Sequence, residues 1–314
     1  MRYIMQRREF LKSGLMGSAA FAVSGLTAMS PKTAHAATVN INMTAEGTFK
    51  TLVDGTSVYV WQFSLSNGSG PGTLTSGLVV NEGDTVNVTL SNNLDRAINF
   101  VVPGITGTTP SVSPGSSRTY SFTASNAGSY YYTDTVNGEI GKAMGLAGPL
   151  VVNASGNRLY SGGPSFDRQY TLALNELDDR LNSAIYNGQS YDMANYEPNY
   201  FFVNGMSYPD TSNDADTVVA MNTGEDVAIR FINTGCITNP QHFHGYHVNV
   251  ASRNRTPETS MGEKDTVLVN LDECVDVILP VIQPGVYPLH THYVPGVTAN
   301  GTYANGALII MSAA

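Results

Sequence analysis

An internal repeat limits the folds open to this chain of 314 residues. Residues 81–92 read NEGDTVNVTLSN, and residues 222–233 read NTGEDVAIRFIN. Each segment is a glycine-containing turn followed by alternating apolar residues, the period-two pattern of a half-buried β-strand. The two copies lie too far apart in the sequence to be neighbouring units of a solenoid, so the repeat predicts a duplicated domain.

The repeat continues to the end of each half of the chain. Residues 127–130 (AGSY) correspond to residues 284–287 (PGVY), and each half then closes on a short apolar strand. Strand-like runs separated by turns, without a long amphipathic helix, are typical of β-sandwiches. We therefore predict an all-β protein with one sandwich at residues 38–155 and a second at residues 166–314.

The first 36 residues have the order of an export signal. Arg7 and Arg8 precede an apolar stretch at residues 15–29, and a small-x-small site follows at residues 34–36. This order is typical of a secretory signal, and the arginine pair resembles the twin-arginine type. The apolar stretch is too short for a stable membrane span. We expect a periplasmic or secreted protein with no stable membrane span after the signal is cleaved.

The net charge limits the kinds of partner that the protein can attract, and the cysteine content suggests whether a disulfide forms. The chain has a net charge of −9, which argues against long-range attraction to nucleic acid or to an anionic membrane. Its two cysteines are Cys236 and Cys274. In an oxidising compartment an isolated pair most simply forms a disulfide, and the alternative is two buried free thiols.

Four histidines form two His-x-His pairs in the second half, His242 with His244 and His290 with His292. On a strand, residues two apart point to the same face, so each pair presents two imidazoles together. Four neutral imidazoles suit copper or zinc, and we predict a metal site. The alternative is ordinary packing. His247 is out of phase with His244, so it is expected to face elsewhere or to hydrogen-bond a ligand.

The motifs around these histidines resemble those of the multicopper oxidases. Residues 239–245 (NPQHFHG) resemble the His-Pro-x-His-x-His-Gly motif, and residues 284–292 (PGVYPLHTH) resemble the approach to the His-Cys-His motif. In the first half, residues 70–72 (GPG) and 82–86 (EGDTV) are similar to the family's N-terminal domain. The resemblance implies two cupredoxin-like Greek-key domains and copper as the cofactor. Family members pass electrons from a type 1 copper to a trinuclear cluster, held by eight histidines, that reduces dioxygen.

The positions of the type 1 ligands depart from this pattern. Aligned on the family motif, they hold Asn239, Thr291, Gly296 and, at the axial position, Gly301. A blue copper site needs a thiolate and two imidazoles. The resemblance therefore implies a protein without type 1 copper, and not a complete laccase-type oxidase.

The first half has also lost its histidines. Their aligned positions hold Asn99, Val101, Thr133 and Thr135, so half of a trinuclear cluster is left, on the second domain. Asp134 lies between two of the lost positions and is a candidate to complete a copper shell, although it could equally be an ordinary loop acid. The expected copper site is thus incomplete and its stoichiometry is open.

Three hypotheses remain for this half-site. One chain could bind one copper or a close pair. A symmetric oligomer could bring two second domains together, although two-domain relatives are trimers with sites between unlike domains. Copper could instead be absent, as in scaffold proteins of the cell envelope with this fold. We expect an exported copper-binding protein that is a candidate oxidoreductase at a type 2-like or coupled copper. A small molecule or a protein would then be its redox partner.

Overall fold

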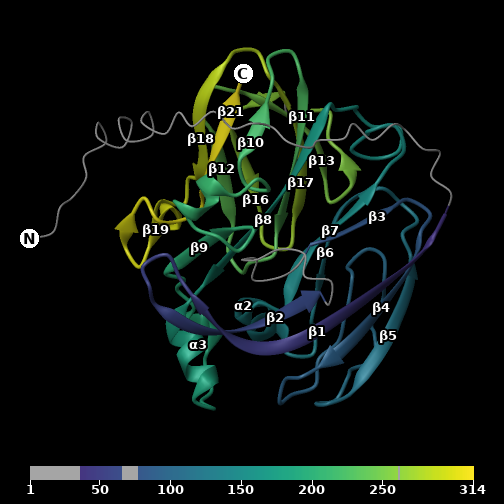
Figure 1. Cartoon of the computed structure of the whole chain (residues 1–314), viewed down its shortest axis with the longest axis vertical. Coiled ribbons are helices and arrows are strands. Elements are labelled where there is room, and N and C mark those ends of the chain that lie inside the picture. The colour runs from purple at the N-terminus through teal and green to yellow at the C-terminus, as the bar shows by residue number, and fades with distance from the viewer. Residues whose placement is uncertain (1–35, 66–76, 261) are drawn as a thin grey trace, which may run out of the picture. The chain divides into compact units, whose positions relative to one another are not determined.

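The computed structural model describes residues 36–65, 77–260 and 262–314, and β-strands dominate it (Figure 1). The predicted export signal, apart from its last residue, and the glycine-proline motif at residues 70–72 lie outside the described residues. Within the described ranges, no helix has the length and apolar character that a bilayer span requires.

The first half forms two sheets, with strand orders β2-β1-β4-β5 and β3-β7-β6. Its elements are β1 (Thr38–Thr51), β2 (Ser57–Leu65), β3 (Leu78–Asn81), β4 (Thr85–Asn92), β5 (Ser117–Thr123), β6 (Gly128–Thr133), α2 (Gly138–Met144) and β7 (Ala147–Asn153). Strand β4 shows why this sequence forms a sandwich. Its alternate residues Val86, Val88 and Leu90 are fully buried, as expected for a strand with one face in the core.

The second half forms a five-stranded sheet, β10-β21-β18-β12-β16, and a larger sheet in which β13, β17, β11, β8 and β9 are successive neighbours. The main elements are β8 (Arg168–Leu177), α3 (Asp179–Tyr186), β9 (Tyr200–Val203), β10 (Val219–Met221), β11 (Asp226–Asn233), β12 (Asn239–Phe243), β13 (Val248–Arg253), β16 (Thr266–Val269), β17 (Cys274–Pro280), β18 (Gly285–Thr291) and β21 (Leu308–Ala313). Short strands at its edges are β14 (Thr256–Pro257), β15 (Glu263–Lys264), β19 (Thr298–Ala299) and β20 (Thr302–Tyr303). Three 3-10 helices are η1 (Met193–Asn195), η2 (Asp210–Asn213) and η3 (Val294–Val297).

Strand pairing repeats between the halves. Strand β4 lies parallel to β1 and antiparallel to β5, and β11 lies parallel to β8 and antiparallel to β17. The closing strands β7 and β21 each pair with one parallel and one antiparallel neighbour. Parallel pairing of strands that are distant in sequence requires a crossover, as in Greek-key sandwiches. The prediction of an all-β chain built from a repeated sandwich is confirmed.

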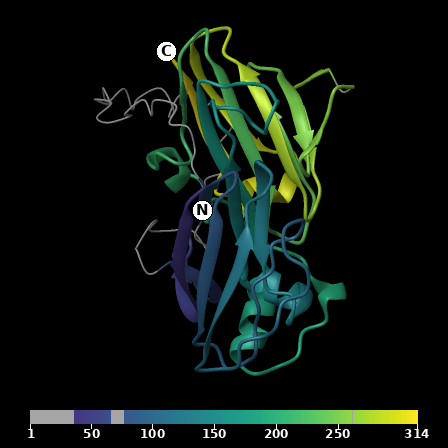
Figure 2. The same ribbon diagram turned by 90° about the vertical axis from the view of Figure 1, so that its right-hand side faces the viewer.

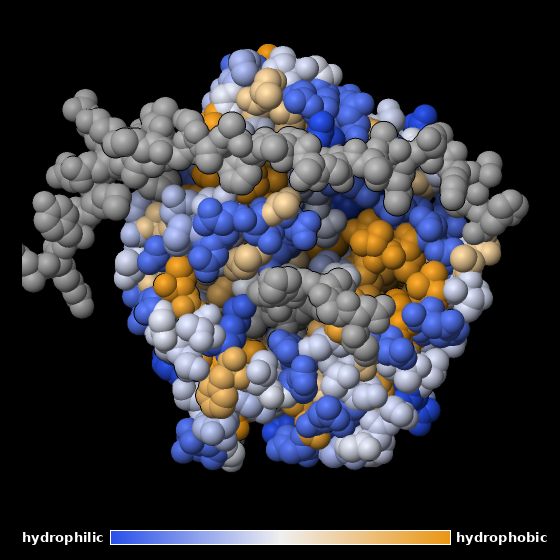
Figure 3. Space-filling model, in the orientation of Figure 1, coloured by the Kyte–Doolittle hydropathy of each residue, from blue (hydrophilic) through white to orange (hydrophobic). Residues whose placement is uncertain are grey.

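Each half has its own hydrophobic core. Trp61, Phe100 and Tyr132 are fully buried in the first, and Phe231 and Phe243 in the second. The strands of the second half, coloured green to yellow, run alongside one another in the ribbon view of Figure 2. The face shown in Figure 3 alternates between hydrophilic and hydrophobic patches, as the surfaces of folded proteins commonly do.

A buried polar cluster joins the two sandwiches. The guanidinium of Arg230 on β11 lies 3.5 Å from the carboxylate of Asp276 on β17, and both side chains are fully buried. Ser129 on β6 donates to Asp276 over 2.5 Å, and Ser252 on β13 donates to its other oxygen over 2.8 Å. Buried charges are tolerated when they are paired and hydrogen-bonded in this way. The cluster therefore fixes β6 of the first half against β11 and β17 of the second.

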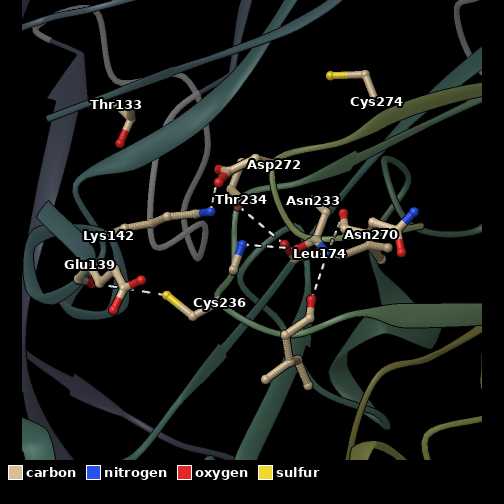
Figure 4. Close-up of polar contacts among 12 residues, drawn as sticks. Thr133, Glu139, Lys142, Leu174, Asn233, Thr234, Cys236, Asn270, Asp272 and Cys274 are labelled. Carbon is tan, nitrogen blue, oxygen red and sulfur yellow. Dashed lines mark hydrogen bonds and ion pairs between the residues drawn. The ribbon is translucent and has the colours of Figure 1, made fainter. Parts of the chain in front are cut away.

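The predicted disulfide is wrong, because both cysteines are free thiols. Cys236 follows β11 and packs against the first core, with its sulfur 3.9 Å from the carbonyl oxygen of Glu139. Cys274 begins β17 and is buried beside Val151 and Ile232. Figure 4 shows the two thiols on separate segments, with other polar side chains between them. A disulfide needs Cα atoms within about 7 Å of each other and Cβ atoms that face each other. An even number of cysteines in the sequence says nothing about these distances.

Candidate metal centre

Strands β12 and β18 bring the two His-x-His pairs together. They are antiparallel neighbours in the five-stranded sheet, and their register places His242 directly opposite His290. The second histidine of each pair, His244 or His292, lies one residue beyond the end of its strand and is exposed. The four imidazoles therefore lie around the His242–His290 pair, with His244 and His292 on opposite sides of it because the strands are antiparallel.

The imidazole rings are close neighbours. Ring centroids lie 4.7 Å apart for His242 and His244, 4.7 Å for His242 and His292, and 5.1 Å for His244 and His290. The Nε2 atoms of His244 and His290 are 3.0 Å apart. Two imidazole nitrogens bound to one metal at about 2.0–2.1 Å each are separated by about 3 Å when their bonds meet near 90–110°. This one pair already has the spacing of two ligands.

The other ring nitrogens hold two of the imidazoles in a ligand orientation. His242 Nδ1 lies 3.1 Å from the carbonyl oxygen of Asp265 and 3.0 Å from Thr266 Oγ1. His290 Nδ1 lies 2.9 Å from the carbonyl oxygen of Thr291. When Nδ1 donates to a carbonyl, Nε2 is the nitrogen left to bind a metal. In His290 this Nε2 lies within hydrogen-bond distance of His244 Nε2, so a metal would replace that contact. Thr266 and the Asp265 carbonyl are contributors that sequence reasoning missed, because cross-strand register is invisible in a single sequence.

Burial keeps one of these imidazoles in the neutral state that a metal requires. The pKa of His290 is lowered, chiefly because burial disfavours the imidazolium, and the neighbouring His242 and His292 lower it further. The hydrogen bond to the Thr291 carbonyl opposes this effect without cancelling it. A neutral imidazole can coordinate a metal whereas an imidazolium cannot, so the local environment favours binding.

Among the histidine, cysteine, aspartate and glutamate side chains that the structure describes, no three are placed to hold one metal ion together. The described donor set thus contains ligands that suit copper or zinc and one pair with ligand spacing, but no group of three. Copper and zinc sites normally use three or four protein ligands.

The two additional candidates lie apart from this cluster. His247 is exposed, and among the described residues no hydrogen bond or ring contact joins it to the four histidines. Asp134 is buried in the first domain. Its carboxylate accepts hydrogen bonds from the backbone nitrogens of Asn99, Val136 and Asn137 and from the Asn137 side chain. It thus organises the loop before α2, and these bonds account for both of its oxygens.

The residues that the motif alignment assigns to the type 1 positions are closely packed. Asn239 and Thr291 are buried, and Thr291 Oγ1 accepts a hydrogen bond from the backbone nitrogen of Tyr293 over 3.2 Å. A Cβ atom on Gly296 would lie 2.5 Å from the Thr291 methyl group. Thr291 and Gly296 therefore pack directly against each other, with no space between them for a larger side chain at position 296.

Comparison with known proteins identifies the family. Multicopper oxidase domains match residues 52–157 and residues 183–304, and the two matches together span more than half of the chain. The chain belongs to the multicopper oxidase family. No curated protein sequence matches it significantly. Copper is thus the metal that the family implies for the histidine cluster.

Solved structures show the same fold. A blue copper oxidase from Nitrosomonas europaea has a TM-score of 0.74 at 23% identity, covering 88% of this chain and 86% of that one. The multicopper oxidase mgLAC also has a TM-score of 0.74, at 25% identity and the same coverages. A copper nitrite reductase from Nitrosomonas europaea has a TM-score of 0.70 at 20% identity, covering 88% of this chain and 94% of that one. The expectation of cupredoxin-like domains in a two-domain multicopper oxidase fold is confirmed.

Proposed function

We propose that this multicopper oxidase relative binds copper through His242, His244, His290 and His292, and that it lacks a type 1 centre. The observation that carries the proposal is the 3.0 Å approach of His244 Nε2 to His290 Nε2, next to two further imidazoles. Bound copper would supply one-electron exchange. Oxidoreductase activity would therefore be that of a type 2-like or coupled copper, with a small molecule or a protein as the electron partner.

The chain itself orients the imidazole rings and favours their neutral form. Thr266 and the Asp265 carbonyl hold the His242 ring, and the Thr291 carbonyl holds the His290 ring. Burial lowers the pKa of His290, which favours its neutral form. Because the rings are held before copper arrives, less conformational entropy is lost on binding.

The absence of a blue centre is supported by the packing at its expected position. Thr291 cannot provide a thiolate, and its methyl group lies against Gly296. Restoring type 1 ligands would require replacing several buried residues together. We therefore expect no intense blue absorption and no laccase-type oxidation of phenolic dyes.

We also propose that the protein is exported and works in the periplasm or outside the cell. The support is the sequence of residues 1–36, with its arginine pair, apolar stretch and small-x-small site. Twin-arginine export carries folded proteins, which would allow the histidine cluster to form before export. Replacing Arg7 and Arg8 with lysine should leave the precursor inside the cell, whereas export of that variant would contradict the assignment.

The test of copper binding is metal analysis combined with electron paramagnetic resonance on protein purified from copper-fed cells. We expect bound copper with a type 2 signal, and we expect His292→Ala to lose both while its circular dichroism stays unchanged. His247→Ala is the matched control, because it removes an imidazole near the cluster in sequence but not in contact with it. Unchanged copper content in His292→Ala would contradict the proposed site.

A copper-free scaffold of the cell envelope is the second candidate. It is favoured by one observation, namely that no three ligand side chains of the described residues converge on a single metal position. Under this alternative, folded protein would remain free of copper after loading. His244→Ala and His292→Ala would then leave both binding and cellular phenotype unchanged.

A further inference from the structure

Thr291 lies between the two histidines of the second His-x-His pair and faces the opposite side of the sheet. It is 1% exposed, whereas His290 is half-buried and His292 is exposed, as expected where successive residues of a strand point to alternate faces. Its side chain therefore lies in the core of the second domain and points away from a metal bound by the histidines. Any effect of this side chain on the metal centre must pass through the backbone.

A closed circuit of hydrogen bonds holds the turn that follows Thr291. The backbone nitrogen of Tyr293 donates to Thr291 Oγ1 over 3.2 Å, and that of Gly296 donates to the Tyr293 carbonyl oxygen over 2.7 Å. Ala307 joins the two ends, because its nitrogen donates to the Gly296 carbonyl oxygen over 2.8 Å and its carbonyl oxygen accepts from the Thr291 nitrogen over 3.3 Å. The Thr291 hydroxyl is the side-chain member of this circuit, and His292 lies within it.

Packing against Gly296 fixes the direction of the Thr291 hydroxyl. A Cβ atom on Gly296 would lie 2.5 Å from the Thr291 methyl group, so this methyl group lies close against the glycine backbone. The methyl and hydroxyl groups are bonded to the same Cβ atom, and a β-branched side chain has few allowed rotamers. The rotamer that places the methyl group against Gly296 therefore also places the hydroxyl at the Tyr293 nitrogen.

The circuit holds the side of His292 that the sheet does not hold. On its amino-terminal side, the His292 nitrogen donates to the Pro240 carbonyl oxygen over 2.6 Å, which continues the pairing of β18 with β12. On its carboxyl-terminal side, the next backbone donor is the Tyr293 nitrogen, which Thr291 binds. The ring centroids of His292 and His242 lie 4.7 Å apart. A change of backbone angle at His292 would move its imidazole relative to this neighbour.

We propose that Thr291 is a positioning residue of the metal centre, whose hydroxyl holds the Tyr293 nitrogen and thereby directs His292 towards His242. The inference rests on the proposed copper function and adds a residue that acts on a ligand without touching the metal. The motif alignment assigns Thr291 to the position of the type 1 thiolate. The side chain at that position thus serves the histidine cluster instead.

The test compares variants that differ by one hydroxyl group. Thr291→Val removes the hydroxyl and keeps the shape of the side chain, whereas Thr291→Ser keeps the hydroxyl. Thr234→Val is the matched control, because Thr234 is also buried in the second domain and its Oγ1 donates to the Leu174 carbonyl oxygen over 3.2 Å, outside the circuit. If Thr291→Val does not fold, Thr291→Ala takes its place, since it differs from Thr291→Ser by the hydroxyl alone.

Two measurements use metal-free protein and a third uses copper. In wild-type protein with labelled histidines, nuclear magnetic resonance should show an Overhauser contact between the rings of His242 and His292 and slow exchange of the Tyr293 amide proton. Thr291→Val should lose the ring contact, exchange that proton about tenfold faster and bind Cu(II) about tenfold more weakly, because the Tyr293 amide loses its acceptor. Thr291→Ser and Thr234→Val should resemble wild type in all three measurements.

Each contrary outcome has a separate meaning. Wild-type ring contact and copper affinity in folded Thr291→Val would refute the positioning role and leave the proposed function intact. Equal losses in Thr234→Val would show a general loosening of the second domain and would also refute that role. Folded wild-type protein that binds no copper would refute the proposed function, and this inference with it. Circular dichroism of each variant separates these results from misfolding.

Discussion

Replacing Glu176 with glutamine should make the protein more stable, and the gain should grow with pH. Glu176 on β8 is buried, and burial raises the pKa of its carboxyl group to about 7, although the Cys236 backbone nitrogen and the charge of Lys142 oppose the rise. One oxygen accepts hydrogen bonds from the Cys236 nitrogen over 2.5 Å and from the Tyr196 hydroxyl over 3.3 Å. Among the residues that the structure describes, none donates a hydrogen bond of good geometry to the other oxygen.

The magnitude follows from proton linkage. Below pH 4.5 both the folded and the unfolded chain keep the carboxyl protonated, so no stability is lost. Between pH 4.5 and about 7 the unfolded chain releases its proton while the folded chain retains it, and the free energy of unfolding falls by about 1.4 kcal/mol for each pH unit. The total loss is about 3 kcal/mol and is complete above about pH 7.

Glu176→Gln removes the ionisation and keeps the accepting oxygen for Cys236 and Tyr196. Urea unfolding of wild type and variant at a series of pH values from 4 to 8 should show a difference that widens by about 3 kcal/mol. Glu263→Gln, at an exposed edge position, controls for the general loss of a negative charge. A difference between wild type and Glu176→Gln that stays constant across the pH range would refute the reasoning.

Three further predictions concern packing and redox state. Arg230→Met should lower the free energy of unfolding by about 3–5 kcal/mol, because it leaves the buried Asp276 without its counter-charge, and equal urea midpoints for the two proteins would contradict this. Gly296→Ala should lower the free energy of unfolding by about 1–3 kcal/mol, because the added methyl group clashes with that of Thr291. In the double variant, Thr291→Ser removes the clashing methyl group and should recover most of that loss, which thermal unfolding would measure. Because both cysteines are free thiols, a reducing agent should leave the melting temperature unchanged. The unfolded, unreduced protein should show two thiols that react with a chromogenic reagent. A count of one or no reactive thiol would show that a disulfide forms.

The fold was largely predictable because its signals are local. In β4 and β11, the alternation of apolar and polar residues after similar turns indicates which side chains are buried. These buried side chains belong to the two hydrophobic cores. The gathering of the histidines was predictable for the same reason, since strand periodicity orients residues two apart. The pairing of His242 with His290 was not, because register is set by contacts between strands.

The features that could not be predicted depend on contacts between segments that are distant in the sequence. Counting two cysteines suggested a bond, but Cys236 and Cys274 pack in different clusters. Glu176 carries no sequence motif, and its unusual pKa arises from burial among side chains from β8 and from the segment after β11. Asp134 looked like a ligand because of its position in the family pattern, whereas three-dimensional contacts show that it organises a loop.

The hydrogen bonds between Asn99 and Thr135 have an evolutionary consequence. A histidine restored at position 99 would leave the Thr135 backbone nitrogen without the amide oxygen it now uses, and it would still find no partner imidazole at positions 133 and 135. A histidine at position 99 alone would thus lower stability without creating a pair of ligands. A copper site in the first domain would therefore require several of these positions to change together.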